Sequence, residues 1–217
     1  MKNLKVSFVL FIILFATTSF KQDKIKILII GDSISIGYTP FVRDHLKDLA
    51  DVSHNPGNAQ HTSKGLKNIE EWIAANEWDI IQFNWGLWDL CYRHPDSKKQ
   101  GQRDKENGIV TSSLEDYEKQ LDALVKIMRE NTDAELIFVT TSYVPKHEAG
   151  RFTKDARKYN RIAKRVMKAN GVKINNIYRA SIDIHDKYGK GDDDVHYHPE
   201  GYEALGELIT DFLKKQI

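Results

Sequence analysis

Short apolar segments alternate with longer amphipathic segments along most of this 217-residue chain, and that alternation constrains its fold most strongly. The apolar segments have the length of strands and the composition of strands buried on both faces. Five strands are predicted, at residues 24–30, 51–53, 79–84, 135–140 and 172–175. Helices are predicted at residues 41–49, 63–75 and 153–170, after the capping box at 112–115, and from Pro199 onward. This order predicts an α/β fold, a three-layer α/β/α sandwich with a five-stranded parallel sheet.

The first twenty residues differ from the rest of the chain. Lys2 and Lys5 precede an apolar run at 6–16, and small or polar residues follow at 17–19. This is the order of a secretory signal peptide, and the run is shorter than the roughly 20 residues that a bilayer span needs. We therefore predict a signal peptide at 1–20 and one domain at 21–217, in a secreted or periplasmic protein with no stable membrane insertion after signal removal. The alternative is an uncleaved anchor or a buried N-terminal helix.

The charge and cysteine content exclude some classes of protein. The formal net charge of the whole chain is +1, and loss of residues 1–20, which contain two lysines and no acidic residue, changes it to −1. A nucleic-acid-binding protein needs a net basic face, so no nucleic-acid partner is expected. Cys91 is the single cysteine, so an exported form has no internal disulfide. We interpret Cys91 as a packed thiol rather than a nucleophile.

Ser33 directly follows the first predicted strand. The order of a buried strand, Gly31-Asp32-Ser33 and then a helix places the serine at the carboxyl edge of the sheet. Backbone N–H groups at the start of a helix point outward there, and they can stabilise the negative charge of a tetrahedral intermediate. These features favour a nucleophilic serine. The alternative is that Ser33 only caps the helix.

His196 favours the catalytic interpretation, because a nucleophilic serine needs a base within reach. The base in turn needs a group that orients it, and Asp193 is the predicted acid, with Asp194 as the alternative. Asp194, His196 and His198 are also closely spaced candidate metal donors. No His-Glu-x-x-His motif or cysteine ligand set accompanies them, so we expect no metal and no cofactor.

Four segments resemble, in their order, the sequence blocks of the SGNH/GDSL hydrolase family of flavodoxin-like serine esterases and acylhydrolases. They are Gly31-Asp32-Ser33-Ile34-Ser35, Asn55-Pro56-Gly57-Asn58, Gly86-Leu87-Trp88-Asp89 and Asp193-Asp194-Val195-His196. The resemblance implies a flavodoxin-like sandwich with Ser33 as nucleophile and His196 as base. It also implies that the backbone N–H of Gly57 donates to the oxyanion, as that of Ser33 can.

Trp88 departs from the family pattern. The third block is usually Gly-x-Asn-Asp, in which the asparagine side chain is an oxyanion donor, and here a tryptophan occupies that position. The indole N–H of Trp88 can still donate, and Asn84 is a second candidate donor. Loss of one such donor costs about 2.7–4 kcal/mol of transition-state stabilisation, so a replacement donor, a slower enzyme or another use of the site is expected. The alternative role of Trp88 is packing.

A polar segment at 91–110 follows the third block and is long for a connection in a compact domain. It supplies candidate substrate-binding residues, and Tyr143 and Arg151 could line the other side of the site. Aromatic faces with cationic donors suit a sugar, particularly one that carries carboxylate or sulfate. The alternative is a solvated loop. The candidates within the segment are Tyr92, Arg93, His94, Arg103 and Lys105.

The expected function is hydrolysis of small esters, with an O-acetylated carbohydrate as the favoured substrate. This expectation rests on the family resemblance, the predicted export and the polar segment. One alternative is an esterase, thioesterase or lysophospholipase that acts on an acyl lipid. Another is a carbohydrate-binding protein on a degenerate hydrolase scaffold, which the tryptophan at position 88 would explain.

Overall fold

The computed structural model describes residues 24–217. The predicted signal peptide at 1–20 lies outside the described residues. Within the described part of the chain, no helix is long and apolar enough to span a membrane.

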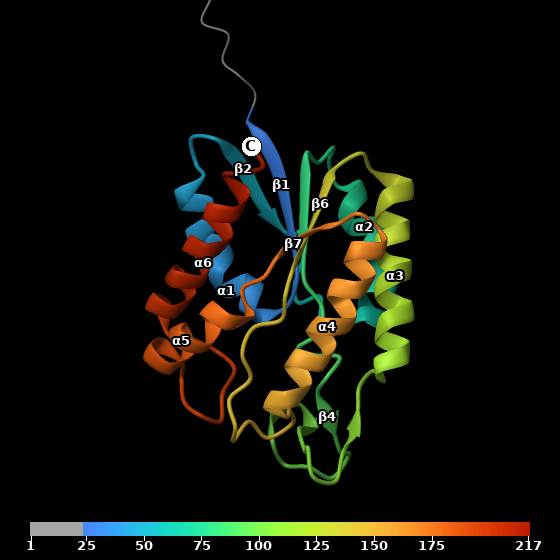
Figure 1. The fold of residues 1–217 in the computed structure, drawn as a ribbon, viewed down its shortest axis with the longest axis vertical. Coiled ribbons are helices and arrows are strands. Elements are labelled where there is room, and N and C mark those ends of the chain that lie inside the picture. The colour runs from blue at the N-terminus through green and yellow to red at the C-terminus, as the bar shows by residue number, and fades with distance from the viewer. Residues whose placement is uncertain (1–23) are drawn as a thin grey trace, which may run out of the picture.

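The described residues form a three-layer α/β/α sandwich around a five-stranded parallel sheet, as the sequence predicts (Figure 1). The strand order is β2-β1-β3-β6-β7, which is the doubly wound order of flavodoxin-like folds. The bounds are β1 Ile25–Ile30, β2 Ala50–His54, β3 Ile80–Phe83, β6 Glu135–Val139 and β7 Lys173–Asn175. All four neighbouring pairs are parallel, so the carboxyl ends of the five strands lie at one edge of the sheet.

Six helices cover the two faces of this sheet within residues 24–217. Figure 1 shows α1, α5 and α6 on one side of it and α2, α3 and α4 on the other. The core lies between these layers, where the side chains of β1, β3 and β6 are almost fully buried. The bounds are α1 Ser33–His45, α2 Thr62–Ala74, α3 Leu114–Asn131, α4 Thr153–Ala169, α5 Tyr178–Tyr188 and α6 Pro199–Leu213.

The first helix begins eight residues earlier than its predicted start at 41. The region before 41 contains Gly37 and Pro40, and both residues disfavour a helix interior. Tertiary packing explains why the helix forms: a Cβ at Gly37 would come within 2.2 Å of the Tyr202 ring of α6. Gly37 therefore lets α1 and α6 pack closely, and this contact outweighs the low local propensity.

The polar segment at 91–110 is folded back on itself. Strand β4 (Tyr92–Arg93) pairs in antiparallel fashion with β5 (Ile109–Val110), and a short 3-10 turn at Gln100–Gln102 lies between them. Figure 1 shows β4 at the end of the molecule opposite the C-terminus. Because the carboxyl ends of the parallel strands face this end, the hairpin lies near the edge of the sheet where sites form.

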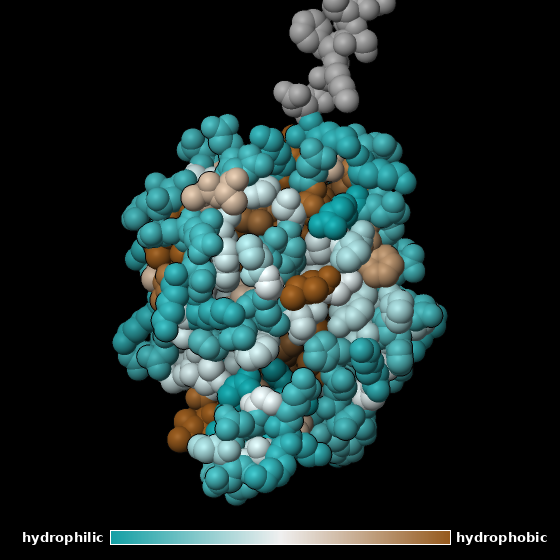
Figure 2. Space-filling view, turned by 180° about the vertical axis from the view of Figure 1, so that it is seen from behind, coloured by the Kyte–Doolittle hydropathy of each residue, from teal (hydrophilic) through white to brown (hydrophobic). Residues whose placement is uncertain are grey.

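The surface is mainly hydrophilic on the face drawn in Figure 2, where apolar residues lie in small separate groups. The exposed large apolar side chains of the described residues belong to different elements. Ile109 is 81% exposed on β5, Ile36 lies on α1 and Ile182 on α5.

Candidate active site

Ser33 is the first residue of α1, immediately beyond the carboxyl end of β1. The cap of the helix is Asp32, whose Oδ1 accepts the backbone N–H of Ile34 at 2.9 Å. The turn is tight, because a Cβ at Gly31 would lie 2.6 Å from the hydroxyl oxygen of Ser35. The capping role that the sequence left open for Ser33 therefore belongs to Asp32. The hydroxyl of Ser33 is left for another partner.

That partner is His196, which lies 163 positions later in the chain. The Ser33 hydroxyl and Nε2 of His196 are 2.9 Å apart, and Nδ1 of His196 is 2.5 Å from Oδ1 of Asp194. An ionised carboxylate can only accept, so Nδ1 carries the ring hydrogen and donates it to Asp194. Nε2 is then the acceptor of the Ser33 hydroxyl. This is the proton arrangement that a serine nucleophile and its base require.

The acid beside His196 is Asp194 and not the predicted Asp193. Oδ1 of Asp194 also accepts the backbone N–H of His196 at 3.0 Å, a turn that aspartate favours two residues before its donor. This turn brings the carboxylate of Asp194 beside the imidazole of His196. Asp193 is exposed and makes no hydrogen bond to His196. The three-residue spacing therefore gave the wrong aspartate.

The two carboxyl groups near Ser33, those of Asp194 and Asp32, have pKa values shifted in opposite directions. Partial burial raises the pKa of Asp194, but hydrogen bonds from the backbone and ring of His196 outweigh it, so the pKa falls below its ordinary value. Burial raises the pKa of Asp32, against a hydrogen bond from the Ile34 N–H and the nearby charges of Arg151 and His196. Asp194 is therefore the firmly ionised member of this pair.

The loop that carries Asp194 and His196 is tied to α5. Nε2 of His185 donates to the backbone carbonyl of Asp194 at 2.7 Å, and the His185 ring packs between those of Tyr143 and Tyr197. The backbone N–H of Lys190 also donates to the carbonyl of His196 at 3.0 Å. The sequence did not single out His185, because α5 was not predicted and its buried side chains form no apolar stripe.

A cleft of about 450 Å³ opens at Ser33 and His196. Of the predicted substrate-binding residues, three arginines line its wall, Arg93, Arg103 and Arg151, whereas Tyr92, His94, Lys105 and Tyr143 do not. The Tyr92 ring packs on Phe152, and Tyr143 lines a separate hollow on the far side of His185. Aromatic residues near a site in the sequence are often drawn into packing, as these two are. The other lining residues, besides Ser33 and His196, are Asn58, Leu87, Trp88, Gln100, Gly101 and Val195.

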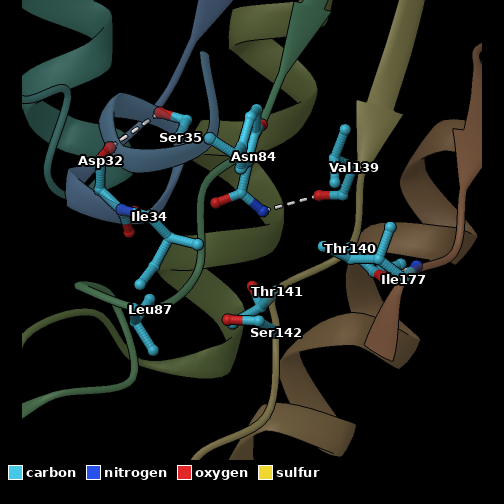
Figure 3. A pocket seen from close by; sticks show the side chains of 11 residues that line it. Asp32, Ile34, Ser35, Asn84, Leu87, Val139, Thr140, Thr141, Ser142 and Ile177 are labelled. Atoms are coloured by element: carbon cyan, nitrogen blue, oxygen red, sulfur yellow. Dashed lines mark hydrogen bonds between the residues drawn. The ribbon is translucent and has the colours of Figure 1, made fainter. Parts of the chain in front are cut away.

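The four predicted oxyanion donors are separated in the structure. Ser33 and Trp88 border the cleft, but the Asn84 amide donates to the Val139 carbonyl at 2.6 Å (Figure 3). Asn84 lines a small cavity of about 10 Å³, together with Asp32 and Ser35, which flank Ser33. Gly57 is exposed and lines another hollow, between α1 and the end of β2. Neither Asn84 nor Gly57 borders the cleft that contains Ser33.

Asn58 borders the cleft instead, and the sequence analysis did not single it out. Its Oδ1 accepts the backbone N–H of Gln60 at 2.8 Å, which fixes the orientation of the amide. The amide N–H₂ is then the group that remains for a ligand. The signal that could have identified Asn58 is its place beside Gly57 in the second sequence block.

Asp89, the last residue of the third block, has a structural position. It is completely buried, and its Oδ1 accepts the backbone N–H and hydroxyl of Thr62 and the hydroxyl of Ser112. Burial raises the pKa of Asp89 to about 6, although these hydrogen bonds oppose the shift. The carboxylate joins the start of α2 to the segment before α3, so it holds the turn that presents Trp88.

Glu148 and Arg151 form a second buried polar connection beside the cleft. Oε1 of Glu148 accepts from Arg103 at 2.7 Å and from Arg151 at 2.8 Å. Arg151 also donates through Nε to the carbonyl of Leu87 at 2.7 Å. The predicted position of Arg151 at the site is correct, and its guanidinium supports the same turn from the other side.

Cys91 and the alternative metal ligands are accounted for by their contacts. Cys91 is buried, and burial raises the pKa of its thiol, as expected for a packed cysteine. Asp194 and His196 bind each other, while His198 is exposed at the start of α6. Within residues 24–217, no three His, Cys, Asp or Glu side chains are grouped as metal ligands.

The model of one protein family, the GDSL-like lipase/acylhydrolase family, matches residues 29–204 of the chain. No curated protein sequence matches it significantly.

Several solved structures share the fold. A lipase/acylhydrolase from Enterococcus faecalis is 19% identical with a TM-score of 0.69, over 88% of this chain and 96% of that one. A catalytic mutant of an acetylxylan esterase from Geobacillus stearothermophilus is 18% identical with a TM-score of 0.68, over 88% and 95%. The acetyl xylan esterase AlAXEase is 15% identical with a TM-score of 0.68, over 87% and 100%. At these identities the likeness shows the fold alone.

Proposed function

Because the chain belongs to the GDSL-like lipase/acylhydrolase family, we propose that it is a serine esterase that removes O-acetyl groups from carbohydrate. The observation that carries this proposal is the hydrogen-bonded series Ser33–His196–Asp194, whose first two members lie in the wall of an open cleft. A serine with its base and an orienting carboxylate is the minimum equipment for acyl transfer.

In the proposed reaction, Oγ of Ser33 attacks the ester carbonyl while Nε2 of His196 takes the hydroxyl proton. His196 then gives that proton to the departing sugar oxygen, and an acetyl-serine remains. A water molecule, deprotonated by His196, attacks the acetyl-serine, and the proton returns to Ser33 as acetate leaves. The sum is one ester and one water converted to one alcohol and one acetic acid. Asp194 keeps the Nδ1 hydrogen in place and stabilises the imidazolium.

The proposed oxyanion donors are the backbone N–H of Ser33, the amide of Asn58 and the indole N–H of Trp88. All three residues border the cleft. Ser33 is at the start of α1, where backbone N–H groups have no helical acceptor. In this proposal Asn58 takes the place that the sequence gave to Gly57, and Asn84 has no part because its amide serves Val139.

The carbohydrate substrate is supported by the chemistry of the cleft wall. Six of its eleven lining residues are arginine, asparagine, glutamine or tryptophan, and these side chains suit a polyhydroxylated ring. Two structures with the same fold are described as acetylxylan esterases. Export of the protein, with removal of residues 1–20, belongs to the same proposal, because polymeric glycans are found outside the cell.

A non-catalytic carbohydrate-binding protein is the second candidate, and one observation favours it. Trp88 occupies the position of the usual oxyanion asparagine, and its ring packs beneath Arg93. An acyl-lipid esterase is less well supported, because the cleft wall contains three arginines and Figure 2 shows only small apolar groups on the face that it draws.

Acetate release tests the proposal directly. The protein without residues 1–20 is compared with its Ser33→Ala variant on 4-nitrophenyl acetate and on acetylated polysaccharides, with 4-nitrophenyl esters of longer acids alongside. Release of acetate that disappears in Ser33→Ala supports the serine esterase. Faster cleavage of long-chain esters would favour the lipid alternative. Glycan binding with no hydrolysis by either protein would favour the binding protein.

A further inference from the structure

Three arginines and no carboxylate form the charged part of the cleft wall. Two carboxylates lie just behind the wall: Glu148, bound to Arg103 and Arg151, and Asp194, bound to His196. The cleft therefore has an excess of positive charge. The excess is located at Arg93, which forms no ion pair within the described residues.

The hairpin holds Arg93 and Arg103 side by side. The two residues face each other in an antiparallel bridge, and facing residues of such a bridge project their side chains to the same side. Like charges in that relation are destabilising. Of these two arginines, only Arg103 is paired with a carboxylate, that of Glu148. The other bonds of Glu148 go to Arg151 and to the backbone N–H of Gly150, and none goes to Arg93. The fold thus maintains an unfavourable pair of cations at the edge of the candidate active site.

The guanidinium of Arg93 is also fixed in orientation. It lies 4.9 Å from the centre of the Trp88 ring, and its Nη1 donates to the carbonyl of Gly101. A guanidinium beside an aromatic ring keeps most of its N–H groups for other acceptors. Among residues 24–217, only one of the two terminal nitrogens of Arg93 forms a hydrogen bond. On Arg103, Nε and Nη1 are engaged, by the Gln100 carbonyl and by Glu148.

We propose that Arg93 and Arg103 bind an anionic group, carboxylate or sulfate, on the sugar from which Ser33 removes the acetyl group. This inference rests on the proposed esterase function and specifies its substrate class as acidic carbohydrate. Guanidinium groups recognise planar oxyanions through paired N–H bonds, and an anion between the two arginines removes their mutual repulsion. Arg93 and Arg103 line the same cleft as Ser33 and His196, so the bound anion is near the reacting ester.

A matched set of substrates tests this inference. Methyl xyloside, methyl glucuronide and methyl glucoside with a sulfate on the exocyclic carbon are prepared with acetyl groups on the remaining ring hydroxyls. The first is neutral, the second carries carboxylate and the third carries sulfate. We expect kcat/KM for one of the two anionic sugars to exceed that of the xyloside by about tenfold or more, which corresponds to about 1.4 kcal/mol. The better anionic substrate distinguishes carboxylate from sulfate.

Variants at one arginine show whether Arg93 is responsible. In Arg93→Gln the preference for the anionic sugar should fall to less than threefold, and Arg93→Lys should retain part of it. Arg161→Gln, at an exposed arginine of α4, is the matched control and should keep the full preference. A ratio of kcat/KM values is used because a partly unfolded variant lowers both values alike. Equal turnover of all three sugars, or an unchanged preference in Arg93→Gln, would overturn the inference.

Failure of the esterase proposal is detected separately. The Ser33→Ala variant cannot form an acetyl-serine, so calorimetry with it measures binding of the three sugars without turnover. If the unaltered protein releases no acetate but Ser33→Ala binds an anionic sugar at least tenfold more tightly than the xyloside, the arginine site stands and the esterase function fails. If acetate is released and binding shows no such preference, the esterase stands and the arginine site fails.

Discussion

Replacement of Asp194 by asparagine gives the sharpest test of the candidate active site. The carboxylate faces an imidazole that becomes positively charged when Ser33 is deprotonated. Opposite charges about 4 Å apart interact by about 4 kcal/mol at the effective dielectric constant of about 20 that suits protein sites. The side chains of His196 and Asp194 are 33% and 38% exposed, so solvent reduces this attraction, and we take about 2–3 kcal/mol as its contribution.

The hydrogen bonds of Asp194 lead us to expect that Asp194→Asn removes the negative charge but keeps the orientation of the His196 ring. The same oxygen of Asp194 accepts both the backbone N–H and Nδ1–H of His196. An asparagine can place its single amide oxygen there and keep the correct tautomer. Asp194→Asn should then lower kcat/KM by about 30- to 150-fold, since each 1.36 kcal/mol is a factor of ten. Asp194→Ala loses the orienting contact as well and should lower it on the order of 10³-fold or more.

The assay is hydrolysis of 4-nitrophenyl acetate, with Asp193→Asn as the matched control. Asp193 is exposed and does not contact His196, so its replacement should change kcat/KM by less than about twofold. Circular dichroism confirms that each variant is folded. An Asp193→Asn enzyme as impaired as Asp194→Asn, or an Asp194→Asn enzyme within threefold of the parent, would refute the assignment of the acid.

Four further predictions concern residues in the cleft wall and near it. Asn58→Ala should lower kcat by on the order of 10²-fold with little change in KM, because an oxyanion donor is lost. Asn84→Ala should instead lower the free energy of unfolding by about 1–3 kcal/mol, measured in urea, because the Val139 carbonyl loses its donor. Asp89 has a folded pKa of about 6, above its unfolded value, so its stabilising effect is present at low pH and is lost as pH rises. From pH 5 to pH 7.5 the parent should therefore lose about 1.4 kcal/mol of unfolding free energy relative to Asp89→Asn. A pH-independent difference between the two proteins would contradict the raised pKa. Glu148→Gln leaves two arginines without their shared buried anion and should cost about 3–5 kcal/mol in the same urea assay; a cost below 1 kcal/mol would show that the arginines find other partners.

The strands could be predicted from the sequence because strands buried on both faces consist mostly of apolar residues. Residues 25–30, 80–83 and 135–139 are runs of apolar residues with few interruptions, as is typical of strands buried on both faces. The helices were less certain. The start of α1 contains a glycine and a proline whose suitability depends on contact with Tyr202, and α5 buries only Ser181 and His185. Helix propensity depends on local sequence and gives no information about such tertiary contacts.

The site was predictable to the level of residue types and chain position, and less so to the level of side-chain contacts. Ser33 and His196 could be paired because a strand end and a pre-helix loop meet at the carboxyl edge of a parallel sheet. Asn84 was misplaced because the two sides of a strand end differ: its amide faces Val139, while Trp88, four residues later, faces the cleft. Three residues lie between them, and the direction of this turn depends on buried Asp89 and Arg151.

The three adjacent aspartates show most clearly what composition and spacing leave open. They are identical in type, yet Asp192 binds His147, Asp193 is exposed and Asp194 binds His196. Their different roles follow from the backbone of one loop, which turns at a glycine with a φ of +150° and is held at Asp194 by the ring of His185. The choice of acid is therefore made by α5, an element with no catalytic motif. Motif spacing selects the candidates, and packing of distant residues selects among them.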